Sequence, residues 1–443
     1  MKINKAILVL IVLMIQFQSA RANCITVIST SLLSPAAQAA GYTASYWPGT
    51  CDTCSGNLGL PSVISLNTGN NFQPPGTLLA SSVGSFLSSA SSVTYSPNQI
   101  LYRCSVEDAG SLYEMYATNG DSPFAGMYAS DEVEGAYYDV AKNVAVRMTN
   151  LSTGQYYSRY WKSRKLTADS WYSDGTYIYI PASAFSNVLY EMFKISSGRH
   201  YASAANPYHD LWAQPRGYIA LKGPGLITNY LMDGQDSAFY YYGFPGQWPA
   251  AWSTYNDVTY VRGALCEVSN YPSVVSLPLI TSRDLSSGMK SQTPFSITLR
   301  CESGAKSDTS PSRFNSANVA MGFLVKQSTA VSKAMSMGLV TPGGGLTWLL
   351  DSSYGSQGTA SGVGIKIYDV NGTPLNLLPD FQSTGMGNSR GWYAYKQLTT
   401  LSSSSDGLEI YNGDFIASLE ALKNQTITAG RVNAQLQVIV SFQ

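Results

Sequence analysis

The stretch that most constrains the fold is residues 430–443, because its pattern fits only one kind of element. Its apolar residues are Val432, Ala434, Leu436, Val438, Val440 and Phe442, and they alternate with polar residues except at Ile439. A period of two is the pattern of a β-strand with one buried face. Gly430 stands at the head of the run and an aromatic residue is next to last. A strand in this position needs something to pair with its free edge.

The residues ahead of this strand predict a small all-β domain from 263 to 443. Cys266 opens it, and the second apolar run ends on Cys301. The third run contains Asn371-Gly372, with a proline at position 374. The four predicted strand regions are residues 274–280, 295–301, 362–375 and 415–422.

The glycine, the alternation and the penultimate aromatic residue together resemble the C-terminal motif of subunits assembled by the chaperone–usher pathway. The resemblance implies an incomplete immunoglobulin-like pilin domain with a Cys266–Cys301 bridge between its first two strands. The missing strand would come first from a periplasmic chaperone and then from an adjacent pilus subunit at the outer-membrane usher, by donor-strand addition. The residues of the assembly strand would be Gly430, Val432, Leu436, Val438, Val440 and Phe442.

Residues 1–22 predict a secretory signal peptide. Lys2 and Lys5 precede an apolar run, and Ala20 and Ala22 supply small residues at the positions that a signal peptidase reads. The run is too short to span a membrane. We therefore expect an exported protein whose first mature residue is Asn23.

Six cysteines, an even number, predict disulfides in an exported chain. Cys24, Cys51, Cys54 and Cys104 lie in the first part, and their three possible pairings stay open. The other two lie far downstream. This distribution predicts two domains, residues 23–262 and 263–443.

Short strands separated by turn residues predict an all-β first domain, a β-sandwich or jelly roll. Residues 143–149, 154–161 and 176–180 are its clearest strands, and residues 182–194 are the best candidate for a short helix.

Composition excludes several classes of function. Lys plus Arg and Asp plus Glu both number 27, so no basic stripe points to nucleic acid as a partner. Two histidines without a matched third ligand predict no metal site, and no cofactor is implied. Without a nucleophile elbow or a phosphate-binding loop, we expect no enzyme activity.

Rings beside carboxylates make residues 206–257 the first candidate for ligand binding. Sugar C–H faces stack on aromatic rings and sugar hydroxyls donate to carboxylates. For any single ring a place in the core is the better interpretation, so the carboxylates are the better individual candidates. A second candidate is the loop at 46–54, and residues 159–165 mix cations with rings in a way that suits an acidic glycan or a solvated strand end. The predicted ligand-binding residues are Trp47, Asp52, Asp210, Trp212, Asp233, Asp236, Tyr241 and Trp248.

The order of the two domains resembles that of two-domain tip adhesins. Asn23 is followed at once by Cys24, so we expect a subunit that accepts a strand and donates none, placed at the fimbrial tip on the cell surface. The function this implies is attachment of bacteria to a host glycan by a lectin-like domain. Recognition of a host protein surface and a pilus-borne glycan hydrolase are the alternatives.

Overall fold

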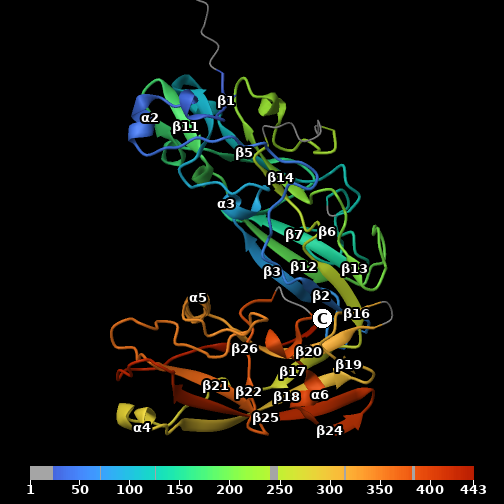
Figure 1. Ribbon diagram of the computed structural model, residues 1–443. Helices are drawn as coiled ribbons and strands as arrows, with labels where there is room; N and C mark the ends of the chain where they lie inside the picture. Colours follow the sequence, from blue (N-terminus) through green and yellow to red (C-terminus); the bar gives the residue numbers. More distant parts are fainter. Residues whose placement is uncertain (1–22, 70, 125, 240–247, 314–315, 382–384) are drawn as a thin grey trace, which may run out of the picture.

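The computed structural model describes residues 23–443 except 70, 125, 240–247, 314–315 and 382–384, so the predicted signal peptide lies outside the described residues. Two β-rich domains lie end to end, with the N-terminal domain above the C-terminal domain (Figure 1). The prediction of an all-β protein is confirmed.

The N-terminal domain contains four small sheets. Their strand orders are β1 (Ile25–Thr26), β4 (Ile100–Ser105), β11 (Tyr177–Pro181), β10 (Tyr172–Ser173); β3 (Leu78–Gly84), β12 (Val188–Lys194), β7 (Val144–Asn150), β6 (Ala136–Tyr138), with β8 (Gln155–Tyr156) on β7; β13 (Tyr208–His209), β16 (Thr259–Gly263), β2 (Val63–Asn67); and β15 (Ala250–Trp252), β14 (Gly217–Lys222), β5 (Tyr113–Thr118), β9 (Lys162–Lys165). The short helices are α2 (Pro35–Ala39), α3 (Phe86–Ser89), η1 (Thr30–Leu32), η2 (Val106–Ser111), η3 (Ala168–Ser170), η4 (Ala182–Ala184) and η5 (Ile227–Tyr230).

Two disulfides resolve the pairing of the first four cysteines. Cys24 is joined to Cys104, which ties the start of the domain to β4, and Cys51 is joined to Cys54 within one loop. The main apolar core contains residues from all four sheets, among them Ile64, Tyr116, Tyr190 and Tyr260.

The predicted helix at residues 182–194 is wrong. Only Ala182–Ala184 form a single turn of 3-10 helix, and Val188–Lys194 form β12 between β3 and β7. Val188, Tyr190 and Met192 are all buried, which is the period of two that a central strand requires. Tertiary pairing outweighed the weak local preference for helix.

The C-terminal domain is a sandwich of two sheets. Their strand orders are β17 (Cys266–Asn270), β18 (Ser291–Glu302), β25 (Leu408–Ala421), β21 (Val363–Asp369), β22 (Pro374–Leu375), with β24 (Thr400–Ser405) on β25; and β19 (Lys306–Ser307), β20 (Asn318–Val325), β23 (Trp392–Ala394), with β26 (Leu436–Phe442) on β20. The helices are α4 (Ser282–Ser286), α5 (Ser328–Ser336), α6 (Tyr395–Leu398) and η6 (Gly387–Ser389).

The core of this sandwich lies between the two sheets. Ile297 and Phe415 come from the first sheet, and Met321, Phe323 and Phe442 come from the second. The predicted Cys266–Cys301 disulfide is present, and these two residues are direct partners in the ladder between β17 and β18. The bridge therefore fastens the first two strands of the domain to each other.

The strand β16 runs from one domain into the other. It pairs in parallel with β2, from Thr259 opposite Val63 to Gly263 opposite Asn67. Tyr260 belongs to the core of the N-terminal domain, whereas its neighbour Val261 belongs to the core of the C-terminal domain. The two domains are thus joined by a paired strand.

Polar contacts beside this strand hold the loop after β2 against the C-terminal domain. The carboxylate of Glu302 accepts from Asn67 Nδ2 (2.5 Å) and from the backbone N–H of Leu265 (3.1 Å). Lys194 Nζ donates to the carbonyl of Asn67 (2.9 Å). The buried carboxylate of Glu302 thus has donors from both sides of the joint and is well satisfied.

Candidate functional site

The strand β26 is paired along one edge only. Gln443 donates its N–H to the carbonyl of Asn318 beside β20 (2.9 Å), and the N–H of Phe442 points the other way, to Ser65 Oγ (3.1 Å). Because successive residues of a strand alternate in direction, Val438 and Val440 turn their N–H and C=O groups away from β20. Among the described residues, no strand pairs with that edge.

The inward face of β26 is only partly covered. Leu436, Val438 and Val440 pack against the core of the sandwich but are half-buried, while Phe442 on the same face is fully buried. On the opposite face Ile439 is buried in a small cluster with Trp392. An alternating apolar face that remains half-exposed indicates that the sandwich lacks the layer that would cover it.

Residues 271–280 pack on the same core as the uncovered face of β26. The sequence predicted a strand here, at residues 274–280. This prediction is wrong: the segment has no ladder, although Val275, Leu277 and Ile280 pack on the core. Side chains hold it to β18, since Ser291 Oγ donates to the carbonyl of Pro278 (2.6 Å) and Thr293 Oγ1 to that of Ser276 (2.7 Å). Because side chains of β18 make these bonds, they do not form the backbone ladder that would make the segment a strand.

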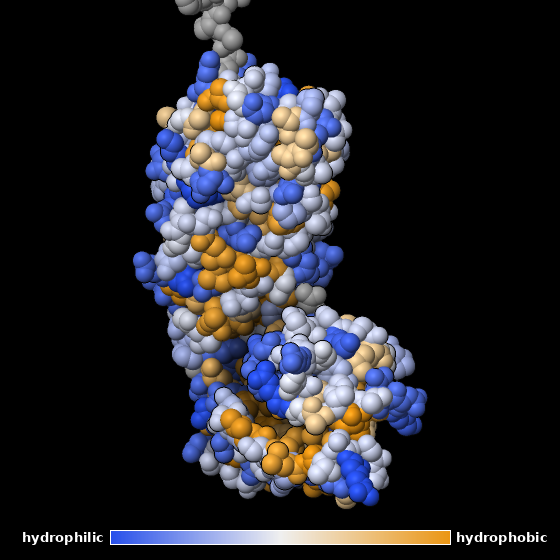
Figure 2. Space-filling model, turned by 90° about the vertical axis from the view of Figure 1, so that its left-hand side faces the viewer, coloured by the Kyte–Doolittle hydropathy of each residue, from blue (hydrophilic) through white to orange (hydrophobic). Residues whose placement is uncertain are grey.

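Figure 2 shows the resulting hollow in the lower domain, with apolar residues gathered in it. We call it the assembly groove, and define it by Leu436, Val438, Val440, Leu277 and Ile280. It presents a free strand edge above an apolar floor. This geometry fits an extended peptide with alternating apolar residues.

Steric crowding explains why the residue at the head of the last predicted strand is a glycine. A side chain at Gly430 would collide with the backbone of Thr359 and Ala360. Because those atoms are main chain, they cannot move aside, so only glycine fits.

Three of the eight predicted ligand-binding residues lie in the core. Trp47 donates Nε1–H to the carbonyl of Val27 (3.0 Å), and Trp248 packs edge-on against Trp161 with ring centroids 5.5 Å apart. Trp47, Trp248 and Asp210 are all buried. A ligand does not reach them in this conformation, so they are not carried into the proposed binding surface.

Asp210 belongs to a buried ionic network. Its Oδ2 accepts from Arg216 Nη2 (2.6 Å) and from Thr254 Oγ1 (2.6 Å). Arg216 also contacts the carboxylate of Asp139 (3.2 Å), which accepts in addition from the hydroxyl of Tyr260 (2.5 Å). The arginine and both carboxylates have no exposed surface. A carboxylate that cannot be buried alone is here buried with its counter-charge, which sequence reasoning did not foresee.

Asp257, beside this network, gives the N-terminal domain a predicted pH response. Burial first, and then the charge of Asp210, raise the pKa of Asp257 to about 6, whereas His209 lowers it. A native pKa above the ordinary value of 3.8 means that the folded state holds the proton more tightly, so this contribution to stability is fully present below that ordinary value and is lost as the pH rises through the native pKa.

We expect Asp257→Asn to remove this part of the pH dependence and to make the domain more stable than the wild type at neutral pH. Urea unfolding of both proteins across the acidic range measures it. Parallel stability profiles for the two proteins would contradict the expectation.

The other predicted residues that the structure describes lie outside the core. Asp52 is exposed on the loop closed by Cys51 and Cys54. Trp212 is half-buried, with its Nε1 3.2 Å from Ser122 Oγ and its ring edge-on to Phe124. Tyr241 lies outside the described residues.

Asp233 and Asp236 lie beside residues 159–165, which end in β9, so two of the three predicted regions meet. Tyr160 and Asp236 form a β-bridge, and Asp233 accepts from the N–H (2.8 Å) and Oγ (3.1 Å) of Ser163. Tyr160 is 53% exposed and Phe239 is 76% exposed. We call Tyr160, Asp233, Asp236 and Phe239 the Tyr160 surface.

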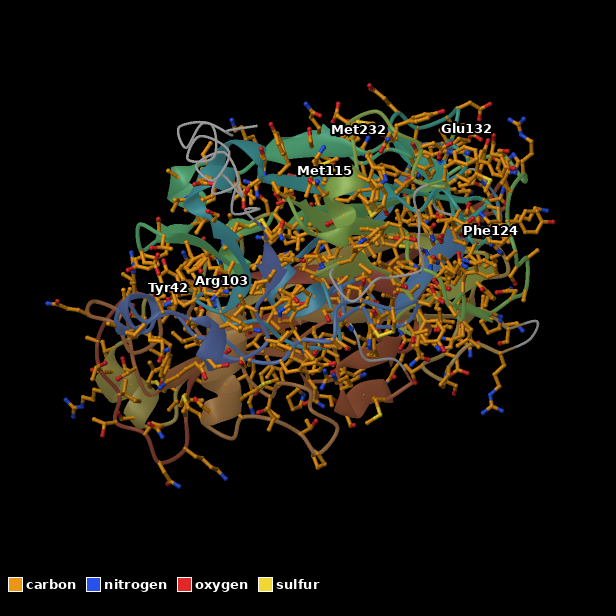
Figure 3. The ribbon with its side chains drawn as sticks, turned by 90° about the horizontal axis from the view of Figure 1, so that it is seen from above. Tyr42, Arg103, Met115, Phe124, Glu132 and Met232 are labelled. Atoms are coloured by element: carbon orange, nitrogen blue, oxygen red, sulfur yellow. A yellow bond between two sulfur atoms is a disulfide. The ribbon has the colours of Figure 1, made fainter. Side chains whose placement is uncertain are left out.

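The Tyr160 surface is separate from the region of Trp47. Figure 3 shows Met232, the neighbour of Asp233, well apart from Tyr42 and Arg103. Arg103 follows Tyr102, whose ring contacts that of Trp47. The loop at 46–54 and the Tyr160 surface are therefore two distinct places.

Three of the four cations in residues 159–165 are already engaged. Arg159 donates to both oxygens of Asp236, with the shortest contact at 2.8 Å, and Arg164 pairs with Glu114 at 2.6 Å. Lys162 Nζ donates to the carbonyl of Tyr156 (2.7 Å), and burial lowers the pKa of Lys162 while Asp233 raises it. The predicted preference for an acidic glycan thus retains only Lys165, which is exposed, of the cations on which it depended.

Phe239 and Tyr160 were not named as individual ligand-binding residues. Both lie inside the candidate regions 206–257 and 159–165. The number of rings in a region, however, does not distinguish an exposed ring from a buried one such as Trp161, next to Tyr160. Ser65, which meets β26, was missed because a lone serine in a strand carries no signal.

Among residues 23–443 with the gaps given above, no group of side chains is arranged to hold a metal ion. No described helix is long and apolar enough to cross a membrane.

Comparison with known proteins assigns the C-terminal part of the chain. The family model described as "Fimbrial protein" matches residues 255–443. No curated protein matches the chain.

Several solved structures are similar at low scores. The CupB6 tip adhesin from Pseudomonas aeruginosa shares 10% identity over 83% of this chain and 87% of that chain, with a TM-score of 0.23. The CsuC–CsuE chaperone–tip subunit pre-assembly complex from Acinetobacter baumannii gives 12% identity over 86% of this chain and 97% of that chain, with a TM-score of 0.20. The P pilus rod subunit PapA gives 15% over 41% of this chain and 100% of that chain, with a TM-score of 0.23.

TM-scores this low carry no argument, so the assignment rests on the family match, with which the strand arrangement around β26 agrees. The resemblance to fimbrial subunits predicted from the last strand is thereby confirmed. Over residues 255–443 the chain is similar to the fimbrial protein family.

Proposed function

We propose that this protein is a fimbrial tip adhesin, whose C-terminal domain accepts a strand from a neighbouring subunit and whose N-terminal domain binds a host receptor. The observation that carries the proposal is the assembly groove. Its floor is apolar, and one of its walls is the unpaired edge of β26.

An inserted strand would satisfy both features at once. Its backbone would pair with the N–H and C=O groups of Val438 and Val440, and its apolar side chains would cover the half-buried floor. In the periplasm a chaperone would supply this strand, and at the usher an incoming subunit would replace it. The protein would then reach the cell surface as part of a fibre.

A position at the fibre end is supported by what precedes the C-terminal domain. The segment directly ahead of β17 is β16, which is paired with β2 along its length. This segment is therefore not free to be donated to another subunit. A subunit that accepts a strand, and has no strand of its own beside the groove to donate, fits the end of the fibre.

The Tyr160 surface is the proposed receptor site. Two exposed rings flank two carboxylates, and rings with nearby acceptors are what a sugar needs. Because Arg159 is paired with Asp236, a neutral glycan fits better than an acidic one. Single sites of this kind bind weakly, and many fibres on one cell would supply avidity.

A binding role fits the carboxylates better than a catalytic one. Burial raises the pKa of Asp236, but hydrogen bonds from Arg159 and from the backbone N–H of Ala238 outweigh it and hold the pKa below its ordinary value. A general acid of a glycan hydrolase needs the opposite shift.

Alanine at both rings tests the receptor site. We expect the double variant Tyr160→Ala with Phe239→Ala to weaken binding by at least roughly thirtyfold, because truncating even one aromatic anchor costs about 2 kcal/mol. Binding of the full mature chain to a glycan array, followed by titration of the best sugar, measures this loss.

Two other exposed tyrosines serve as controls. Tyr46, 71% exposed in the second candidate loop, and Tyr271, 61% exposed in the C-terminal domain, should tolerate alanine. Loss of binding in Tyr46→Ala but not in the double variant would move the site to the loop. Binding only to protease-sensitive host material would replace the glycan by a protein receptor, and release of free sugar would indicate an enzyme.

A further inference from the structure

The assembly groove is closed at the end that faces the N-terminal domain, and the strand that closes it is β2. Ser65 lies in the middle of β2, and its Oγ accepts the N–H of Phe442 (3.1 Å) and lies 3.2 Å from Ser441 Oγ. This N–H belongs to the same edge of β26 as the free N–H groups of Val438 and Val440. The N-terminal domain thus already occupies the last pairing position of the groove.

The backbone of β2 on this side is satisfied without another strand. Gln73 Nε2 donates to the carbonyl of Ser65 (2.9 Å), and Gln73 Oε1 accepts from the N–H of Asn67 (2.7 Å). Gln73 therefore takes the hydrogen bonds that a neighbouring strand would otherwise make. An incoming strand therefore cannot extend its backbone pairing from β26 onto these groups of β2.

Packing closes the same end. The ring of Phe442 has no exposed surface and lies so close to Gly263 of β16 that a side chain at Gly263 would collide with Ala317 and press on the ring. The strand β17 lies beside β26 in this region. Phe442 is consequently part of the joint between the domains, although it shares a face with the groove residues.

We propose that β2, through Ser65, is an end stop that sets the register of the strand entering the groove. The occupant is an extended segment of alternating apolar residues, whose end meets Ser65 once its backbone has paired with Val440. This proposal rests on the strand-accepting function proposed above. It adds that the N-terminal domain, and not the pilin fold alone, selects how far a donated strand extends.

The register matters because successive side chains of a strand point to opposite faces. A shift by one residue along β26 would turn the apolar side chains of the incoming strand away from the floor formed by Leu436, Val438 and Val440. A fixed stop prevents the incoming strand from shifting along β26 toward Phe442. The stop therefore contributes to selection of a partner whose apolar residues lie at the correct distance from its end.

Cysteine cross-linking on the full mature chain tests the stop. All six cysteines are paired in disulfides, so Ser65→Cys introduces a single free thiol. The probe is a series of synthetic peptides of alternating valine and threonine, with lysines outside the alternating region for solubility. Each peptide has one cysteine, stepped from one end to the other.

We expect the disulfide yield with Ser65→Cys to peak at one terminal position and to fall about tenfold two residues away. Gln437→Cys is the matched control, because Gln437 is exposed on the outer face of β26 and should show no preferred position. Equal yields at all peptide positions would overturn the stop.

Amide hydrogen exchange gives a second readout. In the free wild type, Phe442 should exchange slowly while Val438 and Val440 exchange quickly, and the peptide should protect only the latter two. In Ser65→Ala, the amide of Phe442 should exchange about tenfold faster, because it has lost its acceptor. Protection of Phe442 by the peptide in the wild type would also overturn the stop.

The two proposals fail in different ways. If no peptide protects Val438 and Val440, the strand-accepting function and the stop are both wrong. If the peptides protect these two amides but cross-link without preference, the groove accepts a strand and only the stop is wrong.

Discussion

Replacing Arg216 by methionine will destabilise the N-terminal domain by about 3–5 kcal/mol, the usual cost of removing one partner from a buried ion pair. Arg216, Asp139 and Asp210 have no exposed surface, and the arginine is the cation between the two carboxylates. Burial already raises the pKa of Asp139 and the charge of Asp210 raises it further, while Arg216 lowers it. Without Arg216 at least one carboxylate must take up a proton or leave the core.

Calorimetry or urea unfolding of the full mature chain measures this effect, with the N-terminal transition expected to fall by roughly 10 °C. Arg199→Met is the control. Arg199 pairs with Asp131, but both side chains are about two-thirds exposed at 66% and 67%, so no measurable change is expected. A transition of Arg216→Met within experimental error of the wild type would show that the network is not a structural element of the core.

Replacing Val438 by aspartate will abolish incorporation into fibres while leaving the protein folded. Val438 is half-buried on the floor of the assembly groove, so the free protein can solvate a carboxylate there. Once a strand covers the groove, the charge is buried without a partner. Such burial costs several kcal/mol, which corresponds to at least about a hundredfold loss of affinity for the strand.

The neighbouring Gln437→Asp is the matched control, since Gln437 is exposed on the other face of β26. Co-purification with the periplasmic chaperone and immunogold counts along fibres measure capture and incorporation. Display of Val438→Asp at wild-type levels would contradict the proposal that the groove accepts a strand. An equal loss of incorporation in Gln437→Asp would attribute the effect to charge alone. Phe442→Asp should instead unfold the C-terminal domain, because Phe442 has no exposed surface.

The parts of the fold that sequence predicts well depend on local periodicity. The last strand apart from Ile439 and the second half of β18 alternate, and Cys266 and Cys301 begin and end strand patterns, so these strands of the C-terminal domain are predictable from the residues. The two wrong elements fail for a tertiary reason. Residues 188–194 became a strand because β3 and β7 flank them, whereas residues 274–280 contact β18 through side-chain hydrogen bonds and form no backbone ladder with it.

The binding surface was predictable as a region and not as residues. Asp210 and Asp236 have the same side chain in the same aromatic stretch, yet one is buried with Arg216 and the other lies beside Tyr160. The difference depends on partners such as Asp139 and Arg159, which are 71 and 77 residues away along the chain, respectively. Composition cannot reveal such pairings, because they arise only when distant strands are brought together.

The parallel ladder between β2 and β16 has a mechanical consequence for an attached cell in flowing liquid. Tension between a bound receptor and the fibre would draw β16 along the length of β2, so that the hydrogen bonds from Thr259 to Gly263 bear the load together in shear instead of opening one after another. Directly beyond this ladder, the Cys266–Cys301 bridge excludes residues 267–300 from any extension by pulling. The junction should therefore transmit pulling force with little stretch, as a tether of fixed length.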